Sequence, residues 1–449
     1  MTEARLRVFV LMLTDVLTMA AVWAFDVWAY WAIGKHWNLG VGRYLYGWTF
    51  YLRLWPALVA FVVVNVAFRL YQGRVAYPAA PVSPVEEMRR LIASALLTHI
   101  ALVAYIALAN QTMKETSRVV TVFSGGFTAL LVQPMRDLAR LAMSRFRMFR
   151  IPAAVVGPGA AAKRLSEALA KDAYAGFRPA DDDARPHVLF SCEEMDAFRA
   201  HYPEYAQRYT HIEYLPLAGA LPLAGARPIS VDGRGGIEFS SQRRMRLLRF
   251  EKSLLDKSLA LLVFIGSIPL FVVIPVLIKL TSRGPVFYRH SRLGKRGRPL
   301  RVWKFRTMYA DADRRLEAIL ASDPAKKAEW EANFKLTDDP RVTPLGRFLR
   351  RTSIDEFPQL FNVFAGDMTL VGPRPIVDGE VHYYGDDYAT FSSVKPGVTG
   401  LWQASGRSDT DYARRVALDI HYILNWSPWL DLWILKKTFA AVVFMRGAR

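Results

Sequence analysis

The residue types best suited to chemistry gather in one short stretch of the chain. Asp355 and Glu356 are adjacent carboxylates, and Arg350 and Arg351 stand directly before them. Arg374 follows between two prolines, which restrict the backbone on both sides of it. Carboxylates attack phosphorus or bind a divalent cation, whereas guanidinium groups bind phosphate oxygens. The stretch therefore predicts chemistry on a phosphoanhydride, assisted by a divalent cation.

A purely structural interpretation of the two carboxylates is also open. Ser353 and Glu356 have the spacing of a capping box, in which Glu356 would bind the backbone N–H of Ser353. Pro358 conflicts with a helix that begins at Ser353, because its ring would clash with the preceding turn. A helix that begins near Asp355 tolerates Pro358 in its first turn. In either case the carboxylates face the positive end of a helix dipole, which favours their ionised form.

Two further cations, Lys304 and Arg306 in Lys-Phe-Arg-Thr-Met, are assigned to the substrate. They leave the same side of a strand predicted at 300–305, which pairs with 286–288 around a Gly-rich turn. The surrounding run 257–309 contains no Asp or Glu. Attraction to anionic lipid accounts for most of its remaining positive charges.

A Gly-rich segment with polar ends, 395–407, is suited to closing over a nucleotide or a sugar. Gln403 and Arg407 of this segment join the candidate substrate-binding residues. For the Gly-Pro-Arg-Pro stretch around Arg374, the alternative is a plain turn with no ligand.

Composition narrows the class of protein. The formal net charge is +19, and hydrophobic residues make up 52% of the chain. Such a charge indicates nucleic acid, anionic lipid or a phosphorylated substrate as the partner. We expect no nucleic acid, because no helix-turn-helix, RNA-binding or zinc pattern is present. Cys192 is the single cysteine, which excludes a disulfide framework and a cysteine metal site within one chain.

Four apolar stretches are long enough to span a bilayer. They cover residues 6–33, 48–70, 91–109 and 119–141. Lys and Arg gather before the first stretch, between the second and third, and after the fourth. Because positive residues stay on the cytoplasmic side, the N-terminus and everything after about residue 145 are predicted to be cytoplasmic.

A fifth apolar stretch, 258–278, has Lys and Arg on both flanks, so both of its ends favour the cytoplasmic side. Pro269 lies near its centre and removes a helical hydrogen bond. We therefore predict a re-entrant helix, broken at Pro269, that enters and leaves by the same leaflet. The Ser267 hydroxyl is placed to bond a freed carbonyl group. A kinked fifth span is the alternative.

The middle of the chain has a different character. A strand predicted at 151–157 leads into a helix at 163–171 through Gly-Pro-Gly-Ala-Ala-Ala, and acidic residues follow at 181–183. This order is typical of a Rossmann-like domain. Pro158 removes an N–H from the turn that would face a pyrophosphate, so a regulatory or spacer role is favoured over nucleotide binding.

Several long motifs in order resemble the bacterial sugar transferases, a family of monotopic polyprenyl-phosphate hexose-1-phosphate transferases. The motifs are Lys-Phe-Arg-Thr-Met at 304–308, Asp-Pro-Arg at 339–341, Ser-Ile-Asp-Glu-Phe-Pro-Gln-Leu-Phe-Asn-Val at 353–363, Gly-Asp-Met at 366–368, Val-Gly-Pro-Arg-Pro at 371–375 and Lys-Pro-Gly-Val-Thr-Gly at 395–400. The four spans and the middle domain resemble the large subgroup, which includes undecaprenyl-phosphate galactose phosphotransferases. The re-entrant helix of this family carries Ser-Pro at its break, where this chain has Ile268-Pro269.

The resemblance implies a UDP-hexose donor, Mg²⁺ and undecaprenyl phosphate as the acceptor. It implies that Asp355 attacks the sugar-linked phosphate and releases UMP, and that the lipid phosphate then removes the phosphosugar from the enzyme. Asp355 would also be a metal ligand, and Glu356 is the second member of the dyad. Galactose is favoured over glucose, and the product would serve exopolysaccharide, capsule or lipopolysaccharide synthesis at the bacterial inner membrane.

The expected architecture is a membrane helical bundle at 1–145, a Rossmann-like α/β domain at 146–245, and a monotopic α+β catalytic domain at 246–449. Two other functions stay open. Asp355 could serve only as a Mg²⁺ ligand in a direct, single-displacement transfer, or the protein could be a non-catalytic membrane scaffold of polysaccharide assembly. The oligomeric state is also open, with a homodimer as one option.

Overall fold

A computed structural model describes residues 3–37, 55–71, 73–74, 77–78, 83–109, 118–146, 150–171, 177–180, 188–209, 211–215, 227–231, 234–238, 246–323, 326–327, 336, 339–405 and 412–443. Arg407 and the acidic run 181–183 lie outside these ranges. The chain divides into two compact units, Met1–Gly219 and Ala220–Arg449.

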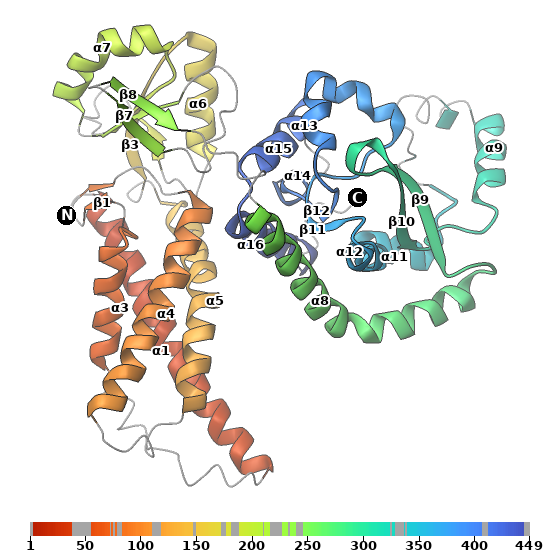
Figure 1. Ribbon diagram of the computed structural model, residues 1–449, viewed down its shortest axis with the longest axis horizontal. Coiled ribbons are helices and arrows are strands. Elements are labelled where there is room, and N and C mark those ends of the chain that lie inside the picture. Colours follow the sequence, from red (N-terminus) through yellow and green to blue (C-terminus); the bar gives the residue numbers. More distant parts are fainter. Residues whose placement is uncertain are drawn as a thin grey trace. The chain divides into compact units, whose positions relative to one another are not determined.

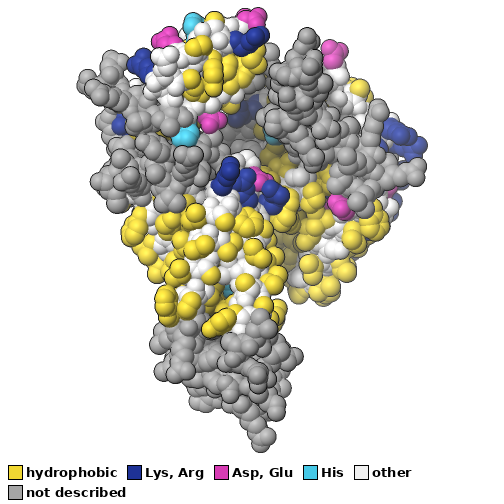
Figure 2. Space-filling model, turned by 60° about the vertical axis from the view of Figure 1, so that its left-hand side comes forward, with side chains coloured by type: hydrophobic (Ala, Val, Ile, Leu, Met, Phe, Trp, Pro, Cys, Tyr) yellow, Lys and Arg dark blue, Asp and Glu magenta, His cyan; other side chains and the backbone are white. Residues whose placement is uncertain are grey.

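Helices of the first unit form a bundle (Figure 1). Their bounds are α1 Glu3–Trp37, α3 Trp55–Ala67, α4 Pro84–Ala109 and α5 Arg118–Met143, and two short strands, β1 Gly73–Arg74 and β2 Tyr77–Pro78, lie between α3 and α4. One buried apolar cluster contains a residue from each of the four helices: Met19, Phe61, Leu91 and Val132. Figure 2 shows hydrophobic side chains over the outside of this bundle. An apolar exterior of this kind is suited to contact with lipid.

Among the described residues, three helices are long and apolar enough to cross a membrane: Leu6–Ala29, Pro84–Tyr105 and Phe250–Thr281. The predicted spans 6–33 and 91–109 therefore coincide with helices of spanning length. The helix within 48–70, α3, is apolar but shorter. The helix over 119–141, α5, is long enough, but ionisable side chains near its C-terminal end lower its hydropathy.

Several ionisable groups inside the bundle pair with one another. Arg136 is fully buried and contacts the carboxylates of Asp15 and Glu87. Arg140 also donates to Glu87, at 2.6 Å. Tyr71 donates its hydroxyl hydrogen to Asp15 at 2.6 Å. Because isolated buried charges are costly, this pairing compensates the charges of Asp15, Glu87 and Arg136 and links α1, α4 and α5.

The middle of the chain forms a parallel sheet of order β4-β3-β5-β6. Its elements are β3 Ile151–Val156, α6 Gly159–Lys171, β4 Phe177–Pro179, β5 Val188–Ser191, α7 Met195–Arg208 and β6 His211–Tyr214. The predicted strand, turn and helix are thus present. Gly157 has φ +153°, and a Cβ there would lie 2.4 Å from Cys192 Sγ. The first glycine of the turn therefore allows close packing against the end of β5.

The second unit contains a hairpin, a small parallel sheet and surrounding helices (Figure 1). Its elements are β7 Arg227–Val231, β8 Arg234–Glu238, α8 Arg246–Thr281, β9 Phe287–Leu293, η4 Lys295–Gly297, β10 Pro299–Phe305, α9 Ala312–Ser322, α11 Pro344–Thr352, η5 Ile354–Glu356, α12 Gln359–Ala365, β11 Thr369–Val371, η6 Asp378–Asp387, α13 Tyr388–Ser392, β12 Gly397–Thr399, α14 Leu401–Ser405, α15 Tyr412–Leu424 and α16 Pro428–Val443. β9 and β10 are antiparallel and pair over their full length, which confirms the predicted hairpin.

The long helix α8 is continuous through Pro269 and Pro275, so the predicted break at Pro269 is instead a bend within one helix (Figure 1). The Ser267 hydroxyl donates to Phe264 O at 3.0 Å, not to the Ile265 carbonyl that Pro269 leaves without its N–H donor. Packing sustains the helix across the bend, because Phe264 and Phe271 both contact the Phe361 ring of α12.

Both halves of α8 pack on the same small domain. Ala260, before the bend, lies in an apolar cluster with Leu300 and Leu360. Ile274, after the bend, clusters with Phe305 and Leu349. The opposite side of α8 exposes large apolar side chains along its length. They include Phe250, Leu254, Leu261, Leu262, Ile265, Ile268, Val272, Val273, Val276 and Leu280.

Candidate active site

The two carboxylates lie in a tight connection between helices α11 and α12. α11 ends at Thr352, and Ser353 caps it in the left-handed conformation, with φ 58°. Asp355 and Glu356 then occupy the 3₁₀ turn η5, before α12 begins at Gln359. A non-glycine residue at positive φ is strained, and such strain is concentrated at functional sites.

The capping box that was the structural alternative for Ser353 and Glu356 does not form. Ser353 is the C-terminal cap of the preceding helix, and its side chain makes no capping hydrogen bond. Glu356 instead accepts a hydrogen bond from Lys304. Pro358 stands at the N-cap position of α12, where a ring without an N–H is tolerated. The structural explanation of Glu356 is therefore replaced by an ion pair with a strand residue.

Close contact with the end of β10 positions helix α11. Thr343 caps its N-terminus by accepting from Gly346 N at 2.9 Å. The backbone of Gly346 lies so close to Thr307 that a Cβ there would be 1.9 Å from Thr307 O. Arg350 Nε donates to the Thr307 hydroxyl at 2.9 Å. The segment after β10 thus fixes both the register of α11 and the direction of Arg350.

Lys304 joins the dyad to the hairpin. Its Nζ lies 2.7 Å from Glu356 Oε1 and 3.8 Å from Asp355 Oδ2. Burial raises the pKa of Asp355 to about 6; the charges of Lys304 and Arg350 oppose this rise, and that of Glu356 adds to it. Asp355 is therefore mostly ionised at neutral pH, yet poorly solvated, which suits a nucleophile.

The hairpin and the Pro-Arg-Pro loop place three more polar side chains near the dyad, and two of them extend the positive charge of the site. His290 and Arg292 face the same side of the hairpin as Lys304, because they pair with Val302 and Leu300. Burial and the charges of Arg292, Lys304 and Arg374 lower the pKa of His290 to about 4. His290 is therefore neutral at pH 7, whereas Arg292 and Arg374 supply charge.

Sequence reasoning missed His290 and Arg292 as site residues. The signal that could have found them is the two-residue period of the hairpin: every second residue of β9 faces the side that carries Lys304. Arg292 is anchored by Glu380, with 3.6 Å between guanidinium and carboxylate.

Arg374 and Arg415 share an aromatic platform. The guanidinium carbon of Arg374 lies 5.6 Å from the Trp402 ring centroid, and that of Arg415 lies 4.9 Å from it. Cations stack favourably on an indole face, so the ring holds both guanidiniums in place. Arg415 was not predicted from the sequence. The Pro-Arg-Pro loop is more than a plain turn, because it delivers Arg374 to this platform.

Asp419, on α15, is a buried acid beside this platform. Tyr384 donates its hydroxyl hydrogen to Asp419 Oδ2 at 2.9 Å. Asp419 Oδ1 has no hydrogen-bond partner within the described part of the chain. Burial raises the pKa of Asp419 to about 8, although the Tyr384 hydrogen bond and the charge of Arg374 lower it. At neutral pH the acid is mostly protonated and leaves the charge of Arg374 uncompensated.

Within the described part of the chain, three other predicted site residues, Arg306, Arg351 and Gln403, show no hydrogen bond or ion pair with the dyad. Arg306 donates to Ser282 O at 2.9 Å and to Arg283 O at 3.0 Å, so it caps the end of α8. Gly284 makes room for it, since a Cβ there would lie 2.1 Å from Arg306 Nη1. Arg351 is exposed on α11.

Gln403 lies on α14, one residue after Trp402. Its Oε1 is buried with no hydrogen-bond partner among the described residues. An unpaired buried acceptor is costly, and a hydrogen-bond donor on a ligand would satisfy it. Arg407, the other residue predicted from this Gly-rich segment, lies outside the described residues.

The fold and the site together define a membrane protein with a buried, partly compensated carboxylate beside several fixed cations. A site of this kind is suited to an anionic, phosphorylated substrate. Comparison with known proteins identifies the family. The family model described as bacterial sugar transferase matches residues 247–445, which contain all of α8 except its first residue, together with the dyad and the residues around it.

Curated relatives extend the match to most of the chain. The undecaprenyl-phosphate galactose phosphotransferase of Salmonella typhimurium is 34% identical over 396 residues, covering 81% of this chain and 82% of that protein. The exopolysaccharide production protein ExoY of Sinorhizobium fredii is 46% identical, over 43% of this chain and 85% of its own length. The UDP-glucose:undecaprenyl-phosphate glucose-1-phosphate transferase of Escherichia coli is 39% identical, over 41% of this chain and 38% of its own. The chain belongs to the bacterial sugar transferase family, and it is an enzyme.

Proposed function

We propose that the protein transfers a hexose-1-phosphate from a UDP-hexose to undecaprenyl phosphate, with Asp355 as the nucleophile. The observation that carries this proposal is the environment of Asp355. Its carboxylate is buried, has a pKa raised to about 6, and is held between Lys304 and Arg350. The names of the Salmonella and Escherichia relatives, which carry undecaprenyl phosphate and galactose or glucose, support the substrate class.

The proposed reaction has two steps. An Asp355 oxygen forms a bond to the phosphorus that bears the hexose, and the bond from this phosphorus to the bridging oxygen breaks, so UMP leaves with the electron pair. An oxygen of the lipid phosphate then attacks the same phosphorus and releases Asp355. Two displacements replace one difficult transfer between two anions. Lys304, Arg292 and Arg374 offset the charge of the phosphates.

The dyad also fits a Mg²⁺ ion. Asp355 and Glu356 offer adjacent carboxylates, and the described residues contain no group of three or more His, Cys, Asp or Glu that could hold a metal. Mg²⁺ commonly takes one or two protein carboxylates and completes its shell with water and substrate phosphate. Bound there, the ion would neutralise charge on the diphosphate and improve UMP as a leaving group.

Helix α8 is proposed to be re-entrant. Both of its halves pack on the same domain, while its outer side is apolar. A straight span would carry one half away from that domain. With basic residues at both ends, this geometry favours insertion into the cytoplasmic leaflet of the inner membrane, with the dyad at the cytoplasmic face.

Galactose is favoured over glucose as the transferred sugar, because the Salmonella relative, which matches 81% of this chain, is named a galactose phosphotransferase.

The proposal is tested by measuring UMP with purified protein, Mg²⁺ and single UDP-hexoses. In the presence of undecaprenyl phosphate we expect steady UMP release and a lipid-linked phosphosugar. Without lipid we expect a burst of at most one UMP per active site and phosphosugar retained on the protein. Turnover with lipid but no burst and no labelled protein would instead indicate direct transfer. A protein that releases no UMP under any condition would fit a scaffold.

Ionisation of Asp419 is expected to shape the dependence of activity on pH above neutrality. As pH rises through about 8, Asp419 loses its proton, and its new negative charge attracts Arg374 away from substrate. We expect the KM for UDP-hexose to rise several-fold between roughly pH 7.5 and pH 9, with kcat less affected. Asp419→Asn keeps the shape of the acid but cannot ionise, so it should abolish this rise. An unchanged rise in the variant would remove Asp419 from the explanation.

A further inference from the structure

A polar network inside the second unit ties the start of α8 to the strand that leads into the Pro-Arg-Pro loop. Lys252 of α8 donates to Asp256 Oδ1 at 2.9 Å and to Asp431 Oδ2 at 2.8 Å. It also donates to Val371 O, at the end of β11, at 2.9 Å. These three contacts use all three hydrogens of the ammonium group. The side chains of Asp256 and Asp431 are 10% and 1% exposed, so the network is shielded from solvent.

Lys252 is the donor on which Val371 O depends. The Tyr422 hydroxyl of α15 lies 2.8 Å from Val371 O and also 2.8 Å from Asp431 Oδ1. A hydroxyl group has one hydrogen, and an ionised carboxylate accepts it more strongly than a carbonyl group does. Trp426 Nε1 also donates to Asp431, at 3.0 Å. While Asp431 is ionised, Tyr422 therefore donates to Asp431, and Lys252 satisfies Val371 O.

The backbone that follows Val371 carries its position to Arg374, three residues later. Gly397 N, on β12, donates to Pro373 O at 2.8 Å. A Cβ on Gly372 would lie 2.9 Å from Gly397 N, so the two segments are in close contact. Proline also restricts the backbone on both sides of Arg374. A shift of Val371 is therefore passed to Arg374 and is not absorbed in between.

The far end of the same loop is held by the hairpin. Leu293 N, at the end of β9, donates to Ile376 O at 2.8 Å, two residues after Arg374. Arg374 thus lies between two backbone anchors. Ile376 is fixed to the strand that carries His290 and Arg292, and Val371 is fixed to α8 by Lys252.

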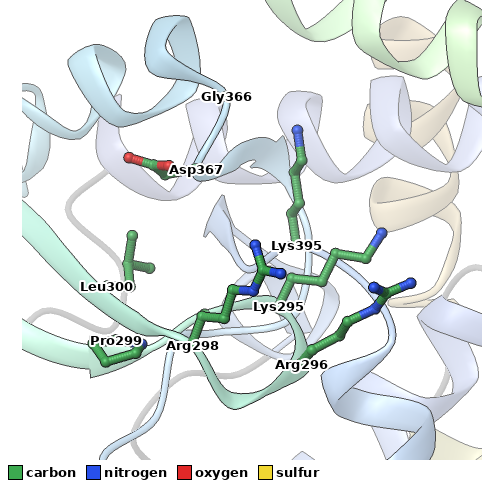
Figure 3. Close-up of a pocket in the computed structure, with 9 residues that line it drawn as sticks. Lys295, Arg296, Arg298, Pro299, Leu300, Gly366, Asp367 and Lys395 are labelled. Atoms are coloured by element: carbon green, nitrogen blue, oxygen red, sulfur yellow. The ribbon is translucent and has the colours of Figure 1, made fainter.

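The opposite end of the β11–β12 sheet borders a cavity. Asp367, before β11, and Lys395, before β12, line a cavity of about 340 Å³ together with residues of the β9–β10 turn (Figure 3). The end of β11 that leads to Arg374 is instead packed against α8 and α16 and bonded to α15. Support from neighbouring helices is therefore concentrated at that end of the strand.

We propose that Lys252 is a positioning residue for Arg374, acting through Val371 O. The proposal rests on the proposed function, in which Arg374 offsets the charge of substrate phosphate. Lys252 does not need to touch the substrate for this role. A catalytic group displaced by about 1 Å can lower a rate by up to about 10²-fold, even when the substitution lies far from the chemistry.

The test is a double-mutant cycle of Lys252→Met and Arg374→Gln, measured as kcat/KM for UDP-hexose with saturating undecaprenyl phosphate. With Arg374 present, we expect Lys252→Met to lower kcat/KM about tenfold. With Arg374→Gln, the same substitution should change it less than about twofold, because the guanidinium that Lys252 positions is gone. If Arg374→Gln is too slow to measure, the cycle is read from the Kd for UDP. Equal factors in both backgrounds would overturn the proposal, because Lys252 would then act on the domain in general.

The matched control is Lys257→Gln, which removes an exposed lysine of the same helix and should leave kcat/KM unchanged in both backgrounds. Lys252→Met leaves two buried carboxylates without their cation, which is destabilising. If it does not fold, Lys252→Met/Asp431→Asn removes one positive and one negative charge together and gives the same test. An unmodified protein that releases no UMP from any UDP-hexose would overturn the proposed function itself. Steady turnover with an additive cycle would overturn only the role of Lys252.

Discussion

Asp355→Asn is expected to abolish transfer of the phosphosugar, with a loss of at least about 10³-fold in kcat. The amide matches the carboxylate in size, but its oxygen cannot form a stable phosphoanhydride-like bond to the hexose phosphate. The measurement is UMP release with and without undecaprenyl phosphate, together with capture of labelled phosphosugar on the protein. Both signals should vanish. Activity near that of the unmodified protein would rule out Asp355 as the nucleophile.

The same substitution should leave the protein at least as stable as before. Burial raises the pKa of Asp355 from 3.8 to about 6, so the folded state holds the proton more tightly than the unfolded state. The stability associated with this proton is fully present below about pH 4 and is lost as pH rises through 6. At pH 7 the ionised carboxylate therefore costs the fold on the order of 3 kcal/mol. Asn removes this cost, and we expect Tm at pH 7 to hold or rise by a few degrees.

Glu356→Gln is the matched control for this pair. It retains the nucleophile and removes the neighbouring charge that helps to raise the pKa of Asp355. Activity should fall less than in Asp355→Asn, and labelled phosphosugar should still form on the protein. If Glu356→Gln loses the covalent label while Asp355→Asn keeps it, the roles of the two carboxylates are reversed.

The sequence predicted the parts of this site that depend on local pattern. The alternating hairpin, the adjacent carboxylates and the Pro-Arg-Pro loop all appear where the residues indicated. Pairing partners were harder to predict. Arg306 follows Lys304 by two residues in the same motif, yet it caps α8, because the strand has ended and Gly284 opens a space for its guanidinium.

Ser353 is a second position at which a sequence pattern did not predict the structure, because its φ of 58° places it at the end of a helix and not at the start of one. Its spacing to Glu356 matches a capping box, but that pattern assumes one helix beginning at Ser353. In the structure one helix ends there and another begins after Pro358. The contact of Lys304 with Glu356 in the folded protein shows that this carboxylate forms an ion pair and does not cap a helix. Long-range contacts of this kind, like the stacking of Arg415 on Trp402, leave no fixed spacing in the sequence.

Lys304→Met should lower kcat by about 10²–10³-fold near pH 7, and the loss should shrink as pH rises. The charge of Lys304 is the largest influence that holds down the pKa of Asp355. Without it, Arg350 is the remaining cation that lowers the pKa of Asp355, Glu356 still raises that pKa, and the proton is retained on Asp355 to a higher pH. The acid limb of the rate profile, expected near pH 6 in the unmodified protein, should therefore move upward by one unit or more.

This dependence on pH separates two roles of Lys304. If the lysine acts only by binding substrate phosphate, its loss lowers the rate by the same factor at every pH, and the acid limb stays in place. If it maintains the ionised nucleophile, alkaline pH restores part of the rate. Lys304→Arg keeps the charge with a different shape and should leave the limb near pH 6, even if its rate is reduced. Added Mg²⁺ should also move the limb to lower pH, because a cation at the dyad favours the ionised carboxylate in the same way.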